Sequence, residues 1–161
     1  MHVLFVRHAA AAETGEFAGS DFDRPLTDDG RERFAAVANW VAARGKTPQV
    51  IVSSPLVRAR QTAEILRDIT GVEHSTLVID DVAAPGISAR RLSEFLAKLG
   101  QEVVAVVGHQ PDMGHCLAKF IGGGHVSFGK GHVACIEFEG DPELETGSLC
   151  WFVGPRDVEQ M

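Results

Sequence analysis

Basic side chains follow three short apolar segments of the sequence. Arg7 and His8 follow the first segment, Arg58 lies a few residues after the second, and His109 follows the third. Arginine offers planar, paired N–H donors that fit the oxygens of a phosphoryl group. A neutral imidazole can accept a phosphoryl group and pass it to water, which divides one difficult reaction into two easier steps. These residues predict a phosphate-binding site with a histidine nucleophile.

Position in the sequence divides the roles among these residues. His8, beside Arg7, fits the nucleophile, and His109 fits a donor to the same phosphoryl oxygens. A single histidine more often has a structural role, but the joint placement of the basic residues favours function. Arg58 and Arg60 are two residues apart on an expected helix, so they cannot both face one pocket equally. One of these two arginines is therefore expected to be structural or peripheral.

Strands and helices are expected to alternate along the chain and to position these residues. Short runs of branched apolar and aromatic residues predict strands, and apolar stripes between capping residues, proline and glycine predict helices. Thr27 and Ser88 are expected helix caps. Pro55 and Pro111 are expected to open two other helices. The expected strands span 3–6, 49–53, 75–79, 103–107, 133–138 and 149–153, and the expected helices span 28–45, 55–70, 88–99 and 111–121.

This order of elements predicts an α/β fold in which residues 1–161 form a single domain. The expected architecture is a three-layer sandwich with a mostly parallel central sheet and helices on both faces. The strand over 103–107 is the most hydrophobic and is expected at the sheet centre, and the last two strands are expected to form an antiparallel hairpin. Because ligands bind at the carboxyl ends of parallel strands, the histidines and arginines are expected to converge on one sheet edge.

Composition and charge limit the classes of partner. The formal net charge of −7 argues against a general nucleic-acid or anionic-membrane binder, but it leaves room for a local basic pocket. No apolar run reaches the length of a membrane helix and no signal peptide is recognised, so a cytoplasmic protein is expected. Cys116, Cys135 and Cys150 adjoin apolar residues, which favours buried, reduced thiols over a metal or redox site. Surface or structural roles are expected for the histidines that lack metal-ligand spacing: His2, His74, His115, His125 and His132.

Four motifs together resemble the histidine phosphatase superfamily, also called the phosphoglycerate mutase-like group. Segment 6–9, Val-Arg-His-Ala, is similar to the Arg-His-Gly signature, with a small alanine in place of glycine. Segments 53–63 and 108–111 resemble the second and third motifs, and segment 24–30 resembles the one that opens the first helix. The resemblance implies a phosphoglycerate mutase-like fold and a phosphohistidine enzyme intermediate. It implies His8 as the phosphorylated nucleophile and phosphoryl-oxygen contacts from Arg7, Arg58 and His109.

Within this superfamily the short chain is similar to the SixA-type protein phosphohistidine phosphatases, because it has little room for the long insertions of mutases and large acid phosphatases. The SixA-type group resembles this chain in lacking a clear general acid. Segment 79–86 offers Asp80 and Asp81, for which a solvated turn and an acid role are equally open, and Asp81 is the candidate acid. Glu13 carries less weight because it lies in an expected loop. A phosphohistidine substrate needs no strong acid, since imidazole leaves more easily than an alkoxide.

Three functions stay open on this evidence. The first is a hydrolase that acts on a phosphohistidine-bearing protein. The second is a phosphomonoesterase for small molecules, which needs Asp81 or another acid in the pocket. The third is a non-catalytic phosphate-binding module, which the complete set of basic residues argues against. No Walker A or GxGxxG pattern is present, so no nucleotide cofactor is expected. A metal is not expected either, because arginine and histidine supply the charge stabilisation.

Overall fold

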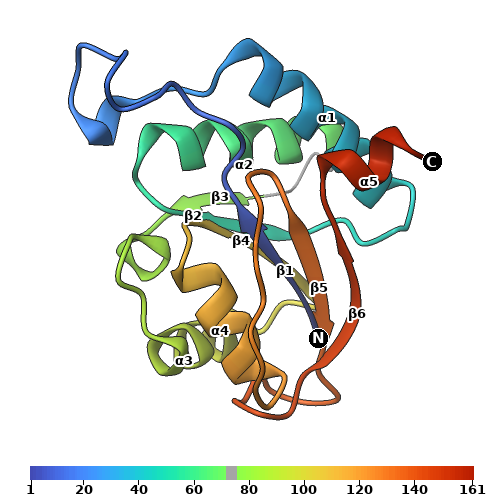
Figure 1. Ribbon diagram of the computed structural model, residues 1–161. Coiled ribbons are helices and arrows are strands. Elements are labelled where there is room, and N and C mark those ends of the chain that lie inside the picture. Colours follow the sequence, from blue (N-terminus) through green and yellow to red (C-terminus); the bar gives the residue numbers. More distant parts are fainter. Residues whose placement is uncertain (72–75) are drawn as a thin grey trace.

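The computed structural model describes residues 1–71 and 76–161, with a six-stranded sheet at the centre of the molecule. The strands follow the order β3-β2-β4-β1-β5-β6 (Figure 1). β1 to β4 are parallel, whereas β5 runs antiparallel to β1 and β6. The mostly parallel sheet, its central strand and the antiparallel final pair are confirmed. The bounds are β1 His2–Arg7, β2 Val50–Ser53, β3 Thr76–Ile79, β4 Val103–Gly108, β5 Val133–Glu137 and β6 Ser148–Val153.

Helices cover both faces of the sheet, which confirms the predicted three-layer α/β architecture. α1, α2 and the short α5 lie on one face, and α3 and α4 pack together on the other (Figure 1). None of the helices in the described part of the chain has the length and apolar character needed to cross a membrane. The bounds are α1 Asp28–Ala42, α2 Val57–Thr70, α3 Ala89–Leu99, α4 Asp112–Phe120 and α5 Pro155–Glu159, with short 3-10 helices η1 at Asp21–Asp23 and η2 at Asp81–Ala83.

Alternation along each strand gives the sheet two hydrophobic cores. In β1, Leu4 and Val6 pack with α1 and α2, and both side chains are fully buried. Val3 and Phe5 of the same strand are fully buried on the opposite face, against α3 and α4. Burial on both faces explains why β1 and β4 are continuous apolar runs in the sequence. The residues that follow these strands are thus held at the edge of a well-packed platform.

Local capping sets several helix boundaries as the sequence predicts. The Thr27 side chain accepts a hydrogen bond from the Gly30 amide at the start of α1, and Ser88 caps α3 in the same way. Gly71 and Gly100 follow α2 and α3 in the left-handed conformation, which glycine adopts without steric cost. These caps fix where α1 and α3 begin and where α2 and α3 end.

Two helix expectations differ from the structure. Pro55 and Pro111 are expected as the first residues of two helices, but both lie before them. α2 begins at Val57 and α4 begins at Asp112. Pro111 occupies the N-cap position of α4, one residue before the helix. α5 is not predicted from the sequence, since its five residues are too few for a helical period to show.

One expectation about the cysteines is wrong. Cys116 and Cys135 are buried as predicted, but Cys150 is exposed. Cys150 lies where the pairing of β5 and β6 changes register between Cys135 and Ile136, and such a bulge redirects side chains. His74 and Ser75, for which the sequence predicts a surface or structural role and a strand start, lie outside the described residues.

Candidate active site

The predicted site residues meet at the carboxyl edge of the sheet. Arg7 ends β1 and His8 follows it, Arg58 lies in the first turn of α2, and His109 follows β4. Together they line a pocket of about 440 Å³. Strand pairing explains this convergence, because β1 and β2 both pair with β4 in parallel. Arg60 is exposed and does not line the pocket, as its position two residues after Arg58 predicts.

The His8 ring is held with one nitrogen free. Its Nδ1 lies 2.8 Å from the Ala9 carbonyl oxygen. A carbonyl can only accept, so Nδ1 carries the proton and Nε2 keeps its lone pair. Burial lowers the pKa of His8 to about 3, and His109, Arg58 and Arg7 lower it further against the opposing effect of the Ala9 hydrogen bond. At neutral pH His8 is therefore a neutral imidazole with Nε2 available as a nucleophile.

His109 has the opposite arrangement of ring nitrogens. Its Nε2 lies 2.8 Å from the Ser54 hydroxyl oxygen, which also accepts a hydrogen bond from the Leu56 amide at 3.3 Å. Within the described residues the Ser54 hydroxyl proton has no acceptor other than His109 Nε2, so we assign it to that nitrogen, which places the ring proton of His109 on Nδ1. His109 Nδ1 is buried and finds no hydrogen-bond partner among the described residues. It is a spare N–H donor beside the pocket.

His8 and His109, called the histidine pair below, lie with ring centroids 5.2 Å apart. Burial lowers the pKa of His109 to about 4, and Arg58 is the next cause in the same direction. Both rings are therefore neutral at pH 7, because burial and the nearby guanidinium groups of Arg7 and Arg58 disfavour the protonated form. One ring offers a lone pair and the other offers an N–H group, which is a complementary pair for nucleophilic attack on phosphorus and for binding a phosphoryl oxygen.

The two predicted arginines place positive charge beside this pair, with Arg58 buried and Arg7 half-buried. Arg7 Nη1 donates to the Phe128 carbonyl oxygen at 2.6 Å, and Arg58 Nη1 donates to the Asp21 carbonyl oxygen at 2.8 Å. Both Nε atoms are buried and have no hydrogen-bond partner within residues 1–71 and 76–161. Burial lowers the pKa of both guanidinium groups, which stay charged at neutral pH. Their unused donors are suited to an anion.

An acidic residue that the sequence analysis missed contacts Arg58. The Asp21 carboxylate lies 3.2 Å from Arg58 Nη2, and it accepts from Arg24 Nε and Nη2 at 3.1 and 2.9 Å. The hydrogen bond from Arg24 lowers the pKa of Asp21, and the charge of Arg58 adds to this effect, so Asp21 is ionised at neutral pH. Arg24 belongs to the 24–30 motif, which was a usable signal. Asp21 belongs to none of the four motifs.

A second ion pair lies at the pocket. Lys130 Nζ is 3.7 Å from Glu13 Oε1, and both residues line the pocket. The pocket thus combines the neutral histidine pair with more cations than carboxylates. This excess of positive charge suits a doubly charged phosphoryl group. The cations are Arg7, Arg24, Arg58 and Lys130, and the carboxylates are Glu13 and Asp21.

The two aspartates considered as acids lie elsewhere. Asp80 caps η2, where its carboxylate accepts a hydrogen bond from the Val82 amide at 2.8 Å. Asp81 is the first residue of η2 and is exposed. Neither residue is among those that line the pocket. The turn observed here matches the solvated-turn alternative for this segment, and an acid role for Asp81 stays a prediction.

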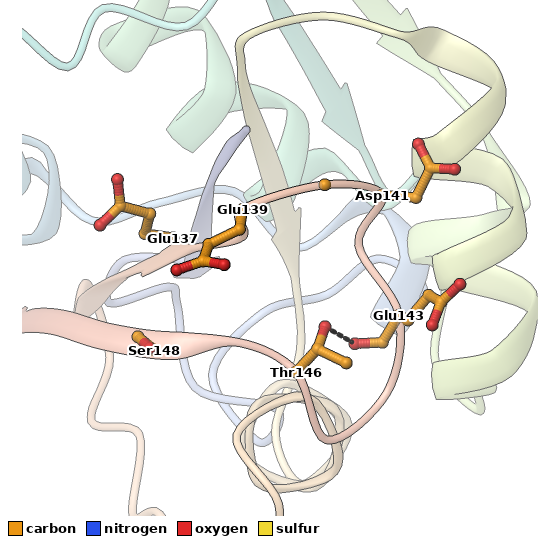
Figure 2. Close-up of a pocket in the computed structure, with 7 residues that line it drawn as sticks. Glu137, Glu139, Asp141, Glu143, Thr146 and Ser148 are labelled. Atoms are coloured by element: carbon orange, nitrogen blue, oxygen red, sulfur yellow. Dashed lines mark hydrogen bonds between the residues drawn. The ribbon is translucent and has the colours of Figure 1, made fainter.

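Another cavity, of about 490 Å³, has the wrong charge for phosphate. Figure 2 shows Glu137, Glu139, Asp141 and Glu143 around it. The Thr146 hydroxyl there donates to the Glu143 carbonyl oxygen at 3.0 Å. Its charged lining residues are all acidic, so it repels a phosphoryl dianion. The basic pocket at the carboxyl edge is therefore the candidate active site.

Comparisons with known proteins show the family to which the chain belongs. The model of the histidine phosphatase superfamily (branch 1) matches residues 3–79. The chain is 32% identical to phosphohistidine phosphatase SixA of Escherichia coli, with 99% of this chain and 97% of that protein aligned. It is 40% identical to an uncharacterized protein of Picosynechococcus, over 71% of this chain and 69% of that protein.

A solved structure shares the whole fold. The protein histidine phosphatase SixA complexed with tungstate superimposes with a TM-score of 0.87 at 25% identity, covering 98% of this chain and 99% of that chain. The sequence and structural likenesses both span almost the entire chain. The chain therefore belongs to branch 1 of the histidine phosphatase superfamily, as a SixA-like member.

Proposed function

We propose that this protein removes the phosphoryl group from phosphohistidine on another protein, through a covalent phosphohistidine intermediate on His8. The arrangement of His8 supports this most directly. Its Nδ1 proton is engaged by the Ala9 carbonyl oxygen, which leaves the Nε2 lone pair available beside Arg7 and Arg58. The relative from Escherichia coli, 32% identical, is named a phosphohistidine phosphatase, which supports the substrate class.

In the first step the Nε2 lone pair of His8 attacks phosphorus, and the bond between phosphorus and the substrate imidazole breaks. The electron pair of that bond stays on the leaving nitrogen, which takes a proton from solvent. Negative charge on the phosphoryl oxygens is held by Arg7, Arg58 and the Nδ1–H of His109. These donors are already in place, so little reorganisation is needed as the charge shifts.

In the second step water attacks phosphorus on the same intermediate. The bond to His8 Nε2 breaks, its electron pair returns to the ring, and inorganic phosphate leaves. The proton of the attacking water passes to solvent or to phosphate. The low pKa of His8 makes its ring a good leaving group in this step, because the neutral ring is the favoured form in the buried site.

The pocket favours an imidazole leaving group over an alkoxide. An ester needs a protonated acid to assist the leaving oxygen. Asp21 is held as a carboxylate by Arg24 and Arg58, and Glu13 is paired with Lys130. The leaving imidazole of phosphohistidine requires less assistance. An acid role for Asp81 remains a separate proposal, tested by comparing the Asp81→Asn variant with the parent protein on both substrates.

The test compares phosphate release from a phosphohistidine-bearing protein and from a simple phosphate monoester, at several pH values. We expect fast release from phosphohistidine and slow release from the ester. His8→Ala should abolish both activities, while the exposed His115 on α4 provides the matched control, His115→Ala, which should retain them. Circular dichroism shows that each variant is folded. Faster ester hydrolysis with an acidic limb in the pH profile would instead identify a small-molecule phosphomonoesterase.

A further inference from the structure

Three metal-ligating side chains meet at the end of the sheet opposite the active site. His2 begins β1, Glu137 ends β5, and Cys150 lies in β6. One ligand atom from each of these residues lies within 4.8 Å of the other two. The strands that carry them are neighbours in the order β1-β5-β6. The cluster therefore brings together a nitrogen, an oxygen and a sulfur atom from three neighbouring strands.

Strand register brings these residues to one face. His2 pairs directly with Glu137 across the antiparallel β1–β5 ladder. In the β5–β6 ladder, Cys135 pairs with Trp151 and Ile136 pairs with Leu149, which leaves Cys150 as the extra residue of a bulge. A bulge directs its extra side chain out of the regular alternation. The bulge thus places the exposed Cys150 thiol near His2 and Glu137.

The chemistry of the three groups matches one class of metal. Imidazole nitrogen, thiolate sulfur and carboxylate oxygen are the ligands that Zn²⁺ prefers, whereas Ca²⁺ and Mg²⁺ prefer oxygen alone. A tetrahedral zinc ion with bonds of about 2.0–2.3 Å holds its ligand atoms roughly 3.3–3.8 Å apart. The three ligand atoms lie within 4.8 Å of one another, so side-chain rotations that move each atom by about 1 Å bring them to that arrangement. A second thiol, Cys135, interacts with Cys150 and is buried.

The ammonium group of Lys46 contacts the His2 side chain of this cluster. Lys46 Nζ lies 3.0 Å from His2 Nε2, and Glu137 Oε1 lies 3.5 Å from the same nitrogen. Burial and Lys46 lower the pKa of His2, Glu137 raises it, and the amino-terminal ammonium lowers it. Lys46 has no acceptor in its side chain, so it donates to the His2 lone pair. That lone pair is the one a metal ion needs, so Lys46 and the metal compete for His2.

We propose that His2, Glu137 and Cys150 bind Zn²⁺, with water at the fourth position and with Lys46 displaced toward solvent. Binding converts the Cys150 thiol to a thiolate and releases one proton to solvent. His8 lies six residue steps after His2 along the extended strand β1, a distance of about 20 Å. The ion therefore does not take part in phosphoryl transfer. It stabilises the fold by joining β1, β5 and β6, whose exposed edge is β6.

The test is a titration of the 161-residue protein with Co²⁺, followed by competition with Zn²⁺. We expect a thiolate-to-cobalt charge-transfer band that zinc removes, at one ion per chain. Cys150→Ser abolishes the band, and Glu137→Gln weakens binding by about tenfold or more, because loss of even an outer-shell partner of a metal costs about 10–100-fold. Lys46→Met strengthens binding roughly tenfold, because it removes a positive charge within a few ångströms of the ion. Zinc also raises the melting temperature of the parent protein and not that of Cys150→Ser.

Two control variants exclude cobalt binding at other groups: His8→Ala tests the histidine pair, and Cys116→Ala tests another thiol. Cys116→Ala changes a buried thiol on α4 and should leave the cobalt band intact. The His8→Ala variant should bind cobalt like the parent protein, whereas Cys150→Ser should keep full phosphatase activity. A cobalt band that survives in Cys150→Ser, or zinc binding that is lost in His8→Ala, overturns the proposal. Absence of any thiolate band in the reduced parent protein overturns it as well. The cobalt and zinc results do not depend on the phosphohistidine substrate.

Discussion

Replacement of Ser54 by alanine tests how His109 is set up as a donor. Ser54 is completely buried and directly follows β2. Its hydroxyl accepts a hydrogen bond from the Leu56 amide and donates one to His109 Nε2, 2.8 Å away. The proton of the His109 ring is thereby kept on Nδ1, beside the pocket. In Ser54→Ala this preference is lost. The His109 ring can then place the proton on Nε2, and Nδ1 presents a lone pair to a negatively charged phosphoryl oxygen.

The size of the effect follows from one hydrogen bond. A buried hydrogen bond between neutral groups contributes about 1–2 kcal/mol when the cost of an unpaired partner is included, which is roughly a 5–30-fold change in the balance of the two ring forms. Complete loss of a donor to the transition state costs about 10²–10³-fold in kcat. We therefore expect kcat of Ser54→Ala to fall roughly tenfold at pH 7, with a smaller change in KM.

The assay is the pH dependence of kcat. Protonated imidazole carries a proton on both nitrogens, so Nδ1 of His109 becomes a donor again as the pH falls toward its pKa of about 4. The deficit of Ser54→Ala should therefore shrink as the pH is lowered. Ser53→Ala is the matched control, because Ser53 is equally buried but donates to the Ser54 carbonyl oxygen. A deficit that is constant with pH, or equal in both variants, refutes this role for Ser54.

Three further results are expected. Asp21→Asn removes the carboxylate that contacts Arg58, so inorganic phosphate should inhibit about threefold more strongly; unchanged or weaker inhibition contradicts competition for this arginine. The histidine pair has pKa values of about 3 and 4, below the unfolded value of 6.5, so the unfolded chain binds more protons. The free energy of unfolding is therefore undiminished by these histidines above pH 6.5 and falls by several kcal/mol toward pH 4. Urea unfolding at pH 7 and pH 5 measures this loss, and an equal free energy of unfolding at both pH values is the contrary result. Gly30→Ala places a methyl group against the Ala10 carbonyl and should cost about 1–3 kcal/mol in urea unfolding, whereas Gly140→Ala, in open space, should be neutral; equal effects contradict the packing.

The fold could be predicted because its signals are local. The strands of the centre are buried on both faces, so β1 and β4 are continuous apolar runs, and capping at Thr27 and Ser88 marks helix starts directly. Boundaries set by tertiary contacts could not be predicted as well. α5 is only five residues long and packs on α1, where Arg33 pairs with Glu159 at 2.7 Å. That contact joins residues 126 positions apart, and no local pattern encodes it.

The active site shows the same division. The positions of Arg7, His8, Arg58 and His109 follow from parallel strands that end at one edge, so their convergence is predictable from strand order. Asp21 reaches Arg58 from a loop, and loop conformation depends on the packing of the whole edge. The tautomers of the histidine pair likewise depend on partners that the sequence does not reveal.

The most direct test of the mechanism is to trap the covalent intermediate. Protein substrate with radiolabelled phosphohistidine is mixed with the enzyme and quenched rapidly, and the label on the enzyme is mapped. We expect an acid-labile phosphoryl group on His8, formed and lost at rates that match turnover, with no label on His8→Ala. Turnover without a labelled enzyme, or label on a residue other than His8, would contradict nucleophilic catalysis by His8.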